Sequence, residues 1–438
     1  MKKYLSPYSI LFIVMSIAAA KGQTENISLK DTEVWALKSS YTAKALEAEG
    51  DAIGNKMTAQ RSLSFPKISF DATYKYLSEV PELNFPGGAK AAFGDNQNYS
   101  VGPILTWTVW DFGSVRKTVK GIESQGASKK HEKKLGNRQI LLSARLAYFK
   151  IQLRTEQKRL VGDSLKLAES QYRDIQNRIK AGSANRIDLL SSHKEVLNFK
   201  LQFRQIQSDL SSDIRDLYAL IGKNNLNESS TSVEVDSIIS SLKELSDKYG
   251  DSQLDEAHLS QHPLIKMHTA NMESNRLMAE SFKANQLPKL SLFLKSSLDY
   301  PNGPVLEQIH QNTIGVALRM PLYEGGKSSN ESAEKENLAR SFENRQNQAR
   351  VDIIRDWNKA KDQLNGLRDK SGIYKNSVSE SLEHAKLVYS SYRAGKTSFL
   401  EVQTANLHAL ETRVQSTTND VQMLIQLAYL ASISEGLK

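Results

Sequence analysis

The strongest constraint on this chain is a turn that occurs twice, with its two glycines 213 positions apart. The first copy is Ala181-Gly182 and the second is Ala394-Gly395. A long helical pattern runs into each turn, and another runs out of it. A repeat with such a period indicates that one architecture occurs twice along the chain, rather than two or three unrelated domains.

The remaining elements follow the same repeat, because each half has the order helix, strand, strand, long helix, turn, long helix. Trp110-Asp111-Phe112-Gly113 and Tyr323-Glu324-Gly325-Gly326 close the strand pairs at the same offset of 213. We expect a first repeat over 23–221, with strands at about 66–76 and 99–110 and a turn at 181–185. A polar linker follows over 222–250. The second repeat covers 251–438, with strands at about 288–299 and 312–323 and a turn at 394–398.

The N-terminus has the composition of a secretory signal peptide. Lys2 and Lys3 precede an apolar run at 10–15, and small residues follow at 18–20. We therefore expect residues 1–22 to be cleaved, which lowers the net charge from +9 to +6. An uncleaved membrane anchor is the alternative, but this apolar run is shorter than the roughly 20 residues of a spanning helix.

Apolar residues at three-, four- and seven-residue spacings predict long helices on both sides of each turn. A helix over roughly 115–180 would be on the order of 100 Å long at about 1.5 Å per residue. A small globular domain cannot contain a helix of that length. We therefore expect each turn to join two helices into a long antiparallel coiled-coil hairpin.

Between the helices, four segments alternate apolar and polar residues with a period of two. In 67–76 every even position is apolar and every odd one is polar. Each segment has about 10 residues, the length of a transmembrane β-strand. A soluble sheet with one solvated face is the alternative, and alternation alone does not exclude it.

Four strands are too few for a membrane barrel made by one chain, because bacterial barrels have at least about eight. An open sheet in lipid leaves unpaired backbone groups, which cost several kcal/mol each. If these strands enter a membrane, the barrel must be shared, and three chains give 12 strands. Only an outer membrane suits a barrel made by an exported chain.

The sequence does not favour catalysis. It contains no cysteine, no HExxH, no G-x-S-x-G and no Walker loop, and its eight histidines are scattered. We expect no catalytic residues, no cofactor and no metal site. The positive charge is spread along the helices rather than clustered, so we expect no nucleic-acid partner.

With its tandem order, the chain resembles the TolC-like outer-membrane efflux family over nearly all of the predicted mature sequence. The residues that carry the resemblance are Leu318-Arg319-Met320-Pro321-Leu322-Tyr323-Glu324-Gly325-Gly326 and Tyr392-Arg393-Ala394-Gly395, the latter followed by 398–402. No single motif is specific for the family. The ordered pair of motifs is more specific, because it occurs twice and follows a signal peptide.

The resemblance implies a mainly helical homotrimer with a small β part in the outer membrane of a Gram-negative bacterium. A 12-stranded barrel would cross the membrane and contact its lipid, and an α-helical tunnel would extend into the periplasm. The inner end would dock on a periplasmic membrane-fusion adaptor and a proton-driven or ATP-driven inner-membrane pump. The chain would then conduct substrates passively, in efflux or in type I secretion.

In the family, contacts between the two hairpins hold the periplasmic entrance shut, and a tyrosine and an aspartate form part of this latch. The matching residues here are Tyr392 and Asp188. The family also has a basic residue at the position of Thr397, so Arg393 or Lys396 is the candidate substitute. The alternative is an ordinary solvated turn.

The family also places two acidic rings at the entrance, at positions that correspond to Glu401 and Thr404. Only Glu401 is acidic here, so we expect one ring, which would favour cations. An exposed acid near a helix N-terminus, favoured by the helix dipole, is the alternative. The two turns are the candidate adaptor contacts, through Ala181, Gly182, Ser183, Ala394, Gly395 and Lys396.

A secreted coiled-coil scaffold or adhesin without a channel is the second interpretation. Such a protein would not need the four alternating segments. Within the channel class, the sequence does not distinguish efflux of small molecules from type I protein secretion, because the pump chooses the cargo.

Overall fold

A computed structural model describes residues 25–88, 90–223 and 233–434 of the chain. The predicted signal peptide over 1–22 lies outside these residues. The chain divides into two compact units, and each draws on both halves of the sequence. We call 1–39, 144–245 and 367–425 the tip unit, and 40–143, 246–366 and 426–438 the sheet unit.

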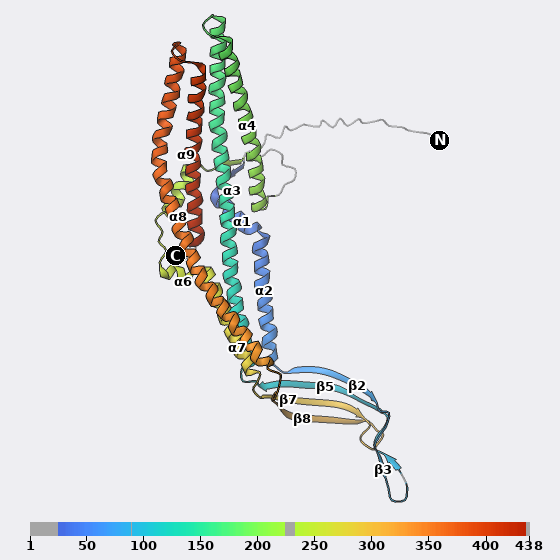
Figure 1. The fold of residues 1–438 in the computed structure, drawn as a ribbon. Helices are drawn as coiled ribbons and strands as arrows, with labels where there is room; N and C mark the ends of the chain where they lie inside the picture. The colour runs from blue at the N-terminus through green and yellow to red at the C-terminus, as the bar shows by residue number, and fades with distance from the viewer. Residues whose placement is uncertain (1–24, 89, 224–232, 435–438) are drawn as a thin grey trace, which may run out of the picture. The chain divides into compact units, whose positions relative to one another are not determined.

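The sheet unit contains one four-stranded antiparallel sheet (Figure 1). Its strands are β2 (Lys67–Tyr76), β5 (Gln97–Trp110), β7 (Lys289–Tyr300) and β8 (Ile309–Arg319), in the order β2-β5-β7-β8. The pair β5–β7 joins the two halves of the chain, with Leu105 opposite Leu294. The connection from β2 to β5, for which the sequence predicted no strand, carries a short hairpin of β3 (Glu82–Asn84) and β4 (Lys90–Ala92).

The period-two alternation gives this sheet one apolar face. Ile68 lies opposite Leu105, Leu105 opposite Leu294, and Leu294 opposite Ile314, so one apolar row crosses all four strands. At the two edge strands these side chains are largely uncovered: Ile68 is 71% exposed and Ile314 is 72% exposed.

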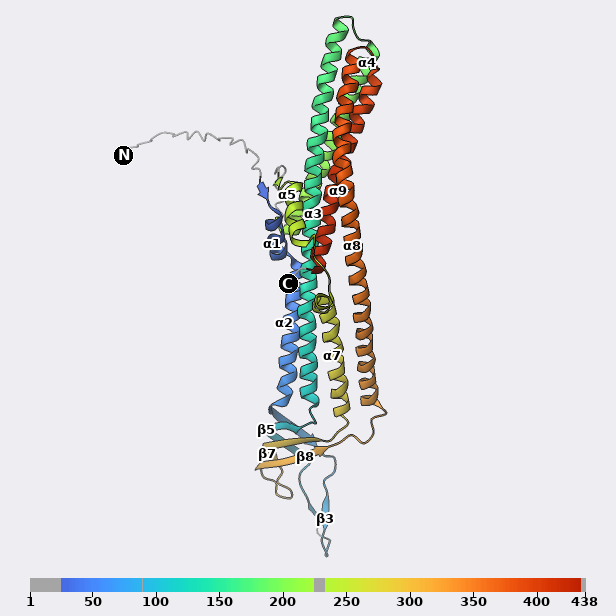
Figure 2. The same cartoon turned by 90° about the vertical axis from the view of Figure 1, so that its left-hand side faces the viewer.

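Helices approach one end of the sheet within the same unit (Figure 2). They are α2 (Tyr41–Arg61), α7 (Pro263–Ala284) and the adjoining parts of α3 (Ser114–Lys180) and α8 (Lys327–Arg393). Hydroxyl contacts join α3 to α7, because Ser114 Oγ donates to Asn285 Oδ1 at 2.7 Å and lies 3.1 Å from Ser281 Oγ. These bonds join the start of α3 to the end of α7 next to the strands.

The first helical segment of each half is broken into two, where the sequence predicted one helix. α1 (Leu29–Ser39) and α2 are separated by Ser40, whose extended backbone lets its side chain accept from the Ala43 N–H. α6 (Glu256–Gln261) is separated from α7 by His262, which precedes Pro263. A residue before proline avoids helical geometry, and a serine favours the N-cap position.

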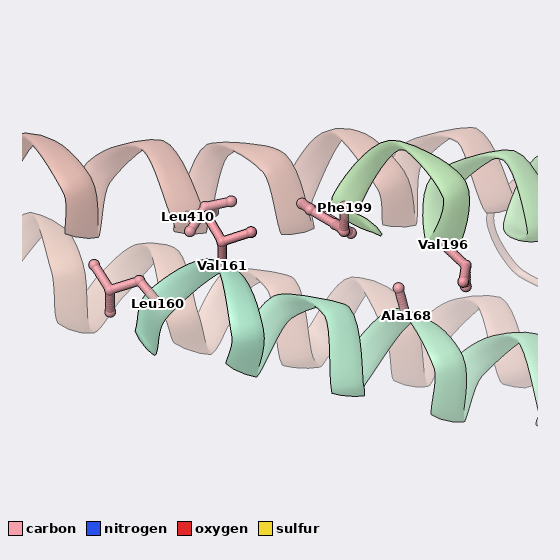
Figure 3. Close-up of a cluster of buried hydrophobic side chains, with 6 residues drawn as sticks. All are labelled: Leu160, Val161, Ala168, Val196, Phe199 and Leu410. Atoms are coloured by element: carbon pink, nitrogen blue, oxygen red, sulfur yellow. The ribbon is translucent and has the colours of Figure 1, made fainter. Parts of the chain in front are cut away.

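Four long helices supply the hairpins of the tip unit. α3 and α8 lead into the turns, while α4 (Arg186–Ile221) and α9 (Phe399–Ser434) return from them. Figure 3 shows a core between α3, α4 and α9, made of Leu160, Val161, Ala168, Val196, Phe199 and Leu410. Full burial of a large apolar side chain contributes about 1.5–3 kcal/mol, so this core holds the hairpins together.

The predicted linker contributes structure to the tip unit. Its residues 233–235 form β6 (Val233–Val235), which pairs in parallel with β1 (Glu25–Ile27), and α5 (Ile238–Tyr249) follows. The Tyr148 hydroxyl of α3 lies 3.0 Å from the Ile27 carbonyl and 2.9 Å from the Asp236 carboxylate. Residues 224–232 lie outside the described part.

The expected fold class is confirmed: the chain is mainly helical, with long helices and a four-stranded antiparallel sheet. In the described ranges, no helix has both the length and the apolar character needed to cross a bilayer. The exact repeat boundaries remain predictions.

Candidate functional site at the hairpin tips

Both hairpins turn through the same backbone motif in the tip unit. Gly182 and Gly395 each have a φ of 74°, in the left-handed region that glycine adopts most easily. In the first turn, Gly182 N–H donates to the Ile179 carbonyl at 2.9 Å, and Ser183 N–H donates to the Arg178 carbonyl at 2.8 Å. This pair of bonds is the Schellman C-cap of a helix.

The second turn repeats both bonds. Gly395 N–H donates to the Tyr392 carbonyl at 2.9 Å, and Lys396 N–H donates to the Ser391 carbonyl at 3.0 Å. The predicted adaptor-contact residues are all exposed: Ala181, Gly182, Ser183, Ala394, Gly395 and Lys396. The turns therefore present backbone and small side chains at the surface of the tip unit.

The returning helices begin alike. Asn185 caps α4 by accepting from Asp188 N–H at 2.8 Å, and Ser398 accepts from Glu401 N–H at 3.3 Å in α9. Asp188 and Glu401 are thus equivalent residues, each the third residue of its helix. Both carboxylates are favoured there by the helix dipole.

The two acids nevertheless have different partners. Asp188 Oδ2 accepts a hydrogen bond from the Tyr392 hydroxyl at 3.0 Å, which joins α8 to α4. Tyr392 is only 7% exposed. Burial, together with the Asp188 carboxylate, raises the pKa of Tyr392 to about 12, so the phenol is a proton donor at neutral pH. The structure thus brings together the two residues predicted to form a latch.

A second tyrosine–aspartate pair lies beside the first and was not predicted. The Tyr389 hydroxyl donates to Asp174 Oδ2 at 2.9 Å, again from α8, here to α3. Burial and the Asp174 carboxylate raise the pKa of Tyr389 to about 12. The sequence signal for this pair was the one-turn spacing between Tyr389 and Tyr392, which puts both phenols on one face of α8.

Arg178 is a cation at this junction that was not predicted from the sequence. Its guanidinium carbon lies 5.4 Å from the centre of the Tyr392 ring, and its Nη2 donates to the Arg393 carbonyl at 2.8 Å. The predicted substitutes, Arg393 and Lys396, have exposed side chains. Neither side chain forms a hydrogen bond or ion pair with another described residue. Arg393 contributes its backbone carbonyl to Arg178, and its charge partly opposes the rise in the pKa of Tyr389.

Apolar packing supports the tyrosines. Tyr392 is clustered with Ile175 of α3 and with Phe399 and Val402 of α9. The Tyr392 and Phe399 rings meet edge to face at 5.4 Å. The phenol hydroxyl therefore reaches Asp188 from a ring that is held on both sides.

Glu401 is bound within its own turn. Its carboxylate accepts from the Thr397 hydroxyl, and Ser398 Oγ lies 3.4 Å from it. With Ser398 also accepting from Glu401 N–H, this arrangement is close to a capping box. Glu401 is exposed, as an entrance residue would be, but its ring role remains a prediction.

Farther from the turns, a buried polar cluster also joins the hairpins. Asn406 of α9 donates to Gln171 of α3 at 3.0 Å and lies 3.5 Å from the Glu195 carboxylate of α4. Gln403 of α9 donates to the Ser191 carbonyl at 3.1 Å. Burial raises the pKa of Glu195, which is 7% exposed.

The described residues contain no group of three or more His, Asp or Glu side chains that would hold a metal ion. The tip unit instead offers hydrogen bonds between hairpins and two exposed turns. Such a site is suited to holding or releasing the helices rather than to bond chemistry.

A model of the family described as outer membrane efflux protein matches residues 35–223 and 255–434. Among solved structures, CusC is similar with a TM-score of 0.78 and 14% identity, over 93% of this chain and 92% of that chain. The Campylobacter jejuni CmeC outer membrane channel has a TM-score of 0.77 and 14% identity, over 93% and 85%. The Neisseria gonorrhoeae MtrE outer membrane channel, solved in its open state, has a TM-score of 0.75 and 14% identity, over 94% and 89%.

These structural likenesses show the fold, and no curated protein matches the chain. The family model carries the assignment, because its two segments cover most of the chain and fall in both halves. The TolC-like resemblance, the channel function, the outer-membrane location and the absence of an enzymatic role are thereby confirmed. The chain belongs to the outer membrane efflux protein family and is an efflux channel that extends into the periplasm.

Proposed function

We propose that three copies of this chain form the exit duct of a tripartite efflux or type I secretion system. The supporting observation is the sheet of the sheet unit, in which β2 and β8 each pair with one described strand only. Open edges of this kind are costly in lipid, because each unpaired backbone group costs several kcal/mol. Pairing between copies removes both edges.

The strand directions suit this closure. Neighbouring strands in β2-β5-β7-β8 are antiparallel, so β2 and β8 run in opposite directions. The β8 edge of one copy is then antiparallel to the β2 edge of the next. The edges also match in length, with 11 residues in β8 and 10 in β2. Three copies close into a barrel of 12 strands whose apolar face contacts outer-membrane lipid.

The tyrosine–aspartate pairs form the latch of the periplasmic entrance. Tyr392–Asp188 and Tyr389–Asp174 join the hairpins within one chain, and a hydrogen bond to a charged group contributes roughly 1.5–3 kcal/mol. Two such bonds per chain stabilise the closed state of the entrance. A partner that binds the open state more tightly shifts the equilibrium toward opening. Arg178 orients the tyrosine, and Arg393 and Lys396 remain available at the surface.

The partner at the turns is a periplasmic membrane-fusion adaptor, which couples the duct to a proton-driven or ATP-driven inner-membrane pump. Beside the two exposed turns, Ile187 is 73% exposed and Leu400 is 70% exposed, at equivalent positions of α4 and α9. Such apolar side chains on a polar surface are suited to contact with another protein. Glu401, beside Leu400, supplies the acidic ring of the entrance.

The native mass of the detergent-extracted protein tests the shared barrel. We expect three times the mass of the mature chain, in the outer-membrane fraction. A stable monomer contradicts the shared barrel and favours a secreted coiled-coil scaffold. Cross-linking of cysteines introduced on β2 and β8, in a chain that has no cysteine of its own, then identifies the paired edges.

A further inference from the structure

The charged residues of the four long strands all lie on one face of the sheet. Residues directly opposite each other on antiparallel strands project to the same face. Lys67 lies opposite Thr106, which lies opposite Phe293, and Lys289 lies opposite Arg319. The face that they share, here called the charged face, carries the basic residues Lys67, Lys75, Lys289, Lys295 and Arg319 and the acidic residues Asp71 and Asp299.

The opposite face decides the orientation of the sheet. It carries uncharged, mostly apolar side chains, and those of the edge strands are widely uncovered: Phe70 is 70% exposed and Val316 is 66% exposed. In an outer membrane channel, such a face contacts hydrocarbon, since charged side chains there are destabilising by about 2–4 kcal/mol at the midplane. The charged face must then face away from lipid.

Two basic side chains of the charged face are bonded to uncharged partners, although Lys295 also interacts electrostatically with Asp299 on the same face. Lys295 Nζ donates to Ser100 Oγ at 2.9 Å and Lys289 Nζ to Asn285 Oδ1 at 3.0 Å, both uncharged partners. No carboxylate of a described residue forms an ion pair with any of these five cations. Lys289 and Arg319 lie directly opposite each other, an arrangement of like charges that destabilises a sheet.

Three basic residues of the helices in the same unit, in contrast, form ion pairs with carboxylates. Lys117 pairs with Glu280 at 3.3 Å, Lys129 with Glu132 at 2.8 Å, and Lys283 with Glu336 at 2.6 Å. Local carboxylates cancel these charges at short range. The charged face, in contrast, carries a surplus of three basic residues over acidic ones.

We infer that the charged face lines the lumen of the barrel and makes the channel selective for anions, so that anionic solutes are the class of cargo that this segment conducts best. The inference rests on the proposed trimeric duct. Three copies place their basic residues around one water-filled space with walls of low dielectric, where the field of each charge adds to the others. Rings of Lys and Arg favour anions in other pores.

The test is the reversal potential of the purified full-length protein in planar lipid bilayers across a KCl gradient. All variants carry Glu401→Gln, which removes the acid predicted at the other end of the channel. The strand variant combines K67Q, K295Q and R319Q. The matched control combines K117Q, K129Q and K283Q, which removes the same number of positive charges from locally paired residues.

The parent in this comparison carries Glu401→Gln alone. We expect its reversal potential to have the sign of a chloride-selective channel. The strand variant shifts it toward the potassium side, while the helix control leaves it unchanged. The salt dependence of the reversal potential tests the same inference without a strand variant. The anion preference should decline as the Debye length falls from about 10 Å at 0.1 M salt to about 3 Å at 1 M.

The outcomes separate this inference from the proposed function. A trimer that conducts ions but prefers cations, has no preference, or responds equally to both triple variants contradicts the charged lumen and leaves the channel intact. A folded trimer without conductance contradicts the proposed duct itself, and the charged lumen with it.

Discussion

The two hairpin turns have the same backbone and different chemistry. Both end a long helix with a left-handed glycine, and both start the next helix with a side-chain cap and an acid three residues later. Yet Asp188 of the first turn accepts a hydrogen bond from Tyr392 of the other hairpin, while Glu401 of the second turn accepts one from Thr397 of the same turn. Equivalent positions in the two halves have therefore acquired different partners.

The difference extends along the junction between the hairpins. The first hairpin supplies the carboxylates Asp174, Asp188 and Glu195, and the second supplies neutral donors from Tyr389, Tyr392 and Asn406. The contacting residues are not equivalent in the repeat, because Tyr392 corresponds to Ile179 and Asp188 to Glu401. Divergence of the two halves therefore gives a junction in which each charge meets an uncharged donor, and where a small change in geometry breaks several bonds.

The largest effect is expected when the second hairpin loses both phenol hydroxyls. Tyr389→Phe with Tyr392→Phe keeps the rings and removes two bonds, each worth roughly 1.5–3 kcal/mol. Since 1.4 kcal/mol corresponds to about a tenfold change in an equilibrium, the open fraction should rise by more than tenfold. The mean conductance of single channels in planar bilayers, averaged over open and closed states, measures this change.

Tyr374→Phe is the matched control for that double variant. Tyr374 also lies on α8, within the tip unit, and its hydroxyl forms no hydrogen bond with another described residue. Its conductance should equal that of the parent. Equal conductance in the double variant and this control would show that the tyrosines do not hold the entrance.

A smaller effect should separate the two equivalent acids. Asp188→Asn weakens the Tyr392 bond from a charge-assisted to a neutral one, a loss of about 1 kcal/mol, whereas Glu401→Gln breaks no contact between hairpins. Both changes lose the same dipole interaction of about 0.3–1 kcal/mol, so their difference isolates the latch. Conductance should increase for Asp188→Asn only, and an increase of the same size in Glu401→Gln would contradict the comparison.

The sequence predicted this site only in part, for a physical reason. The turns and the Tyr392–Asp188 pair were accessible because glycine spacing, helix periodicity and a family resemblance place them. Arg178 and Asp174 were not, since a charged residue on a long helix resembles any other solvated residue until a neighbouring helix covers it. The contact depends on the rotation of α3 against α8, which local periodicity does not fix.

The sheet shows the opposite case. Alternation assigned the central residues of the four long strands to their faces, because successive side chains of a strand project to opposite faces. It did not fix the strand ends, since the fourth strand was expected at about 312–323 and β8 spans Ile309–Arg319. The broken first helices were missed, since Ser40 and His262 act as caps only when the chain bends there. Local rules thus predicted the strands and the turns, while contacts between helices required the structure.

The two turns should respond equally to a loss of glycine. Alanine in left-handed geometry costs about 1–2 kcal/mol, so Gly182→Ala and Gly395→Ala should each lower thermal stability. Gly372→Ala, within α8, where an added methyl meets open space, should raise stability by about 0.5–1 kcal/mol. Melting temperatures of the three variants measure the effect, and a large difference between the two turn variants would contradict their equivalence.

The smallest effect concerns Glu195, the third acid of the first hairpin. Burial raises its pKa, while hydrogen bonds from Asn406 and Gln403 partly oppose that shift. The folded state therefore holds the proton more tightly than the unfolded state, and this residue lowers stability as pH rises from about 4.5 to neutral. Glu195→Gln keeps a group that Asn406 can contact and removes the charge, so it should flatten the decline of melting temperature over that range. Glu383→Gln, an exposed change on α8, should leave the decline as it is. If both variants follow the parent curve, the Glu195 carboxylate is charged at no cost, and the junction tolerates a third acid without a dedicated phenol.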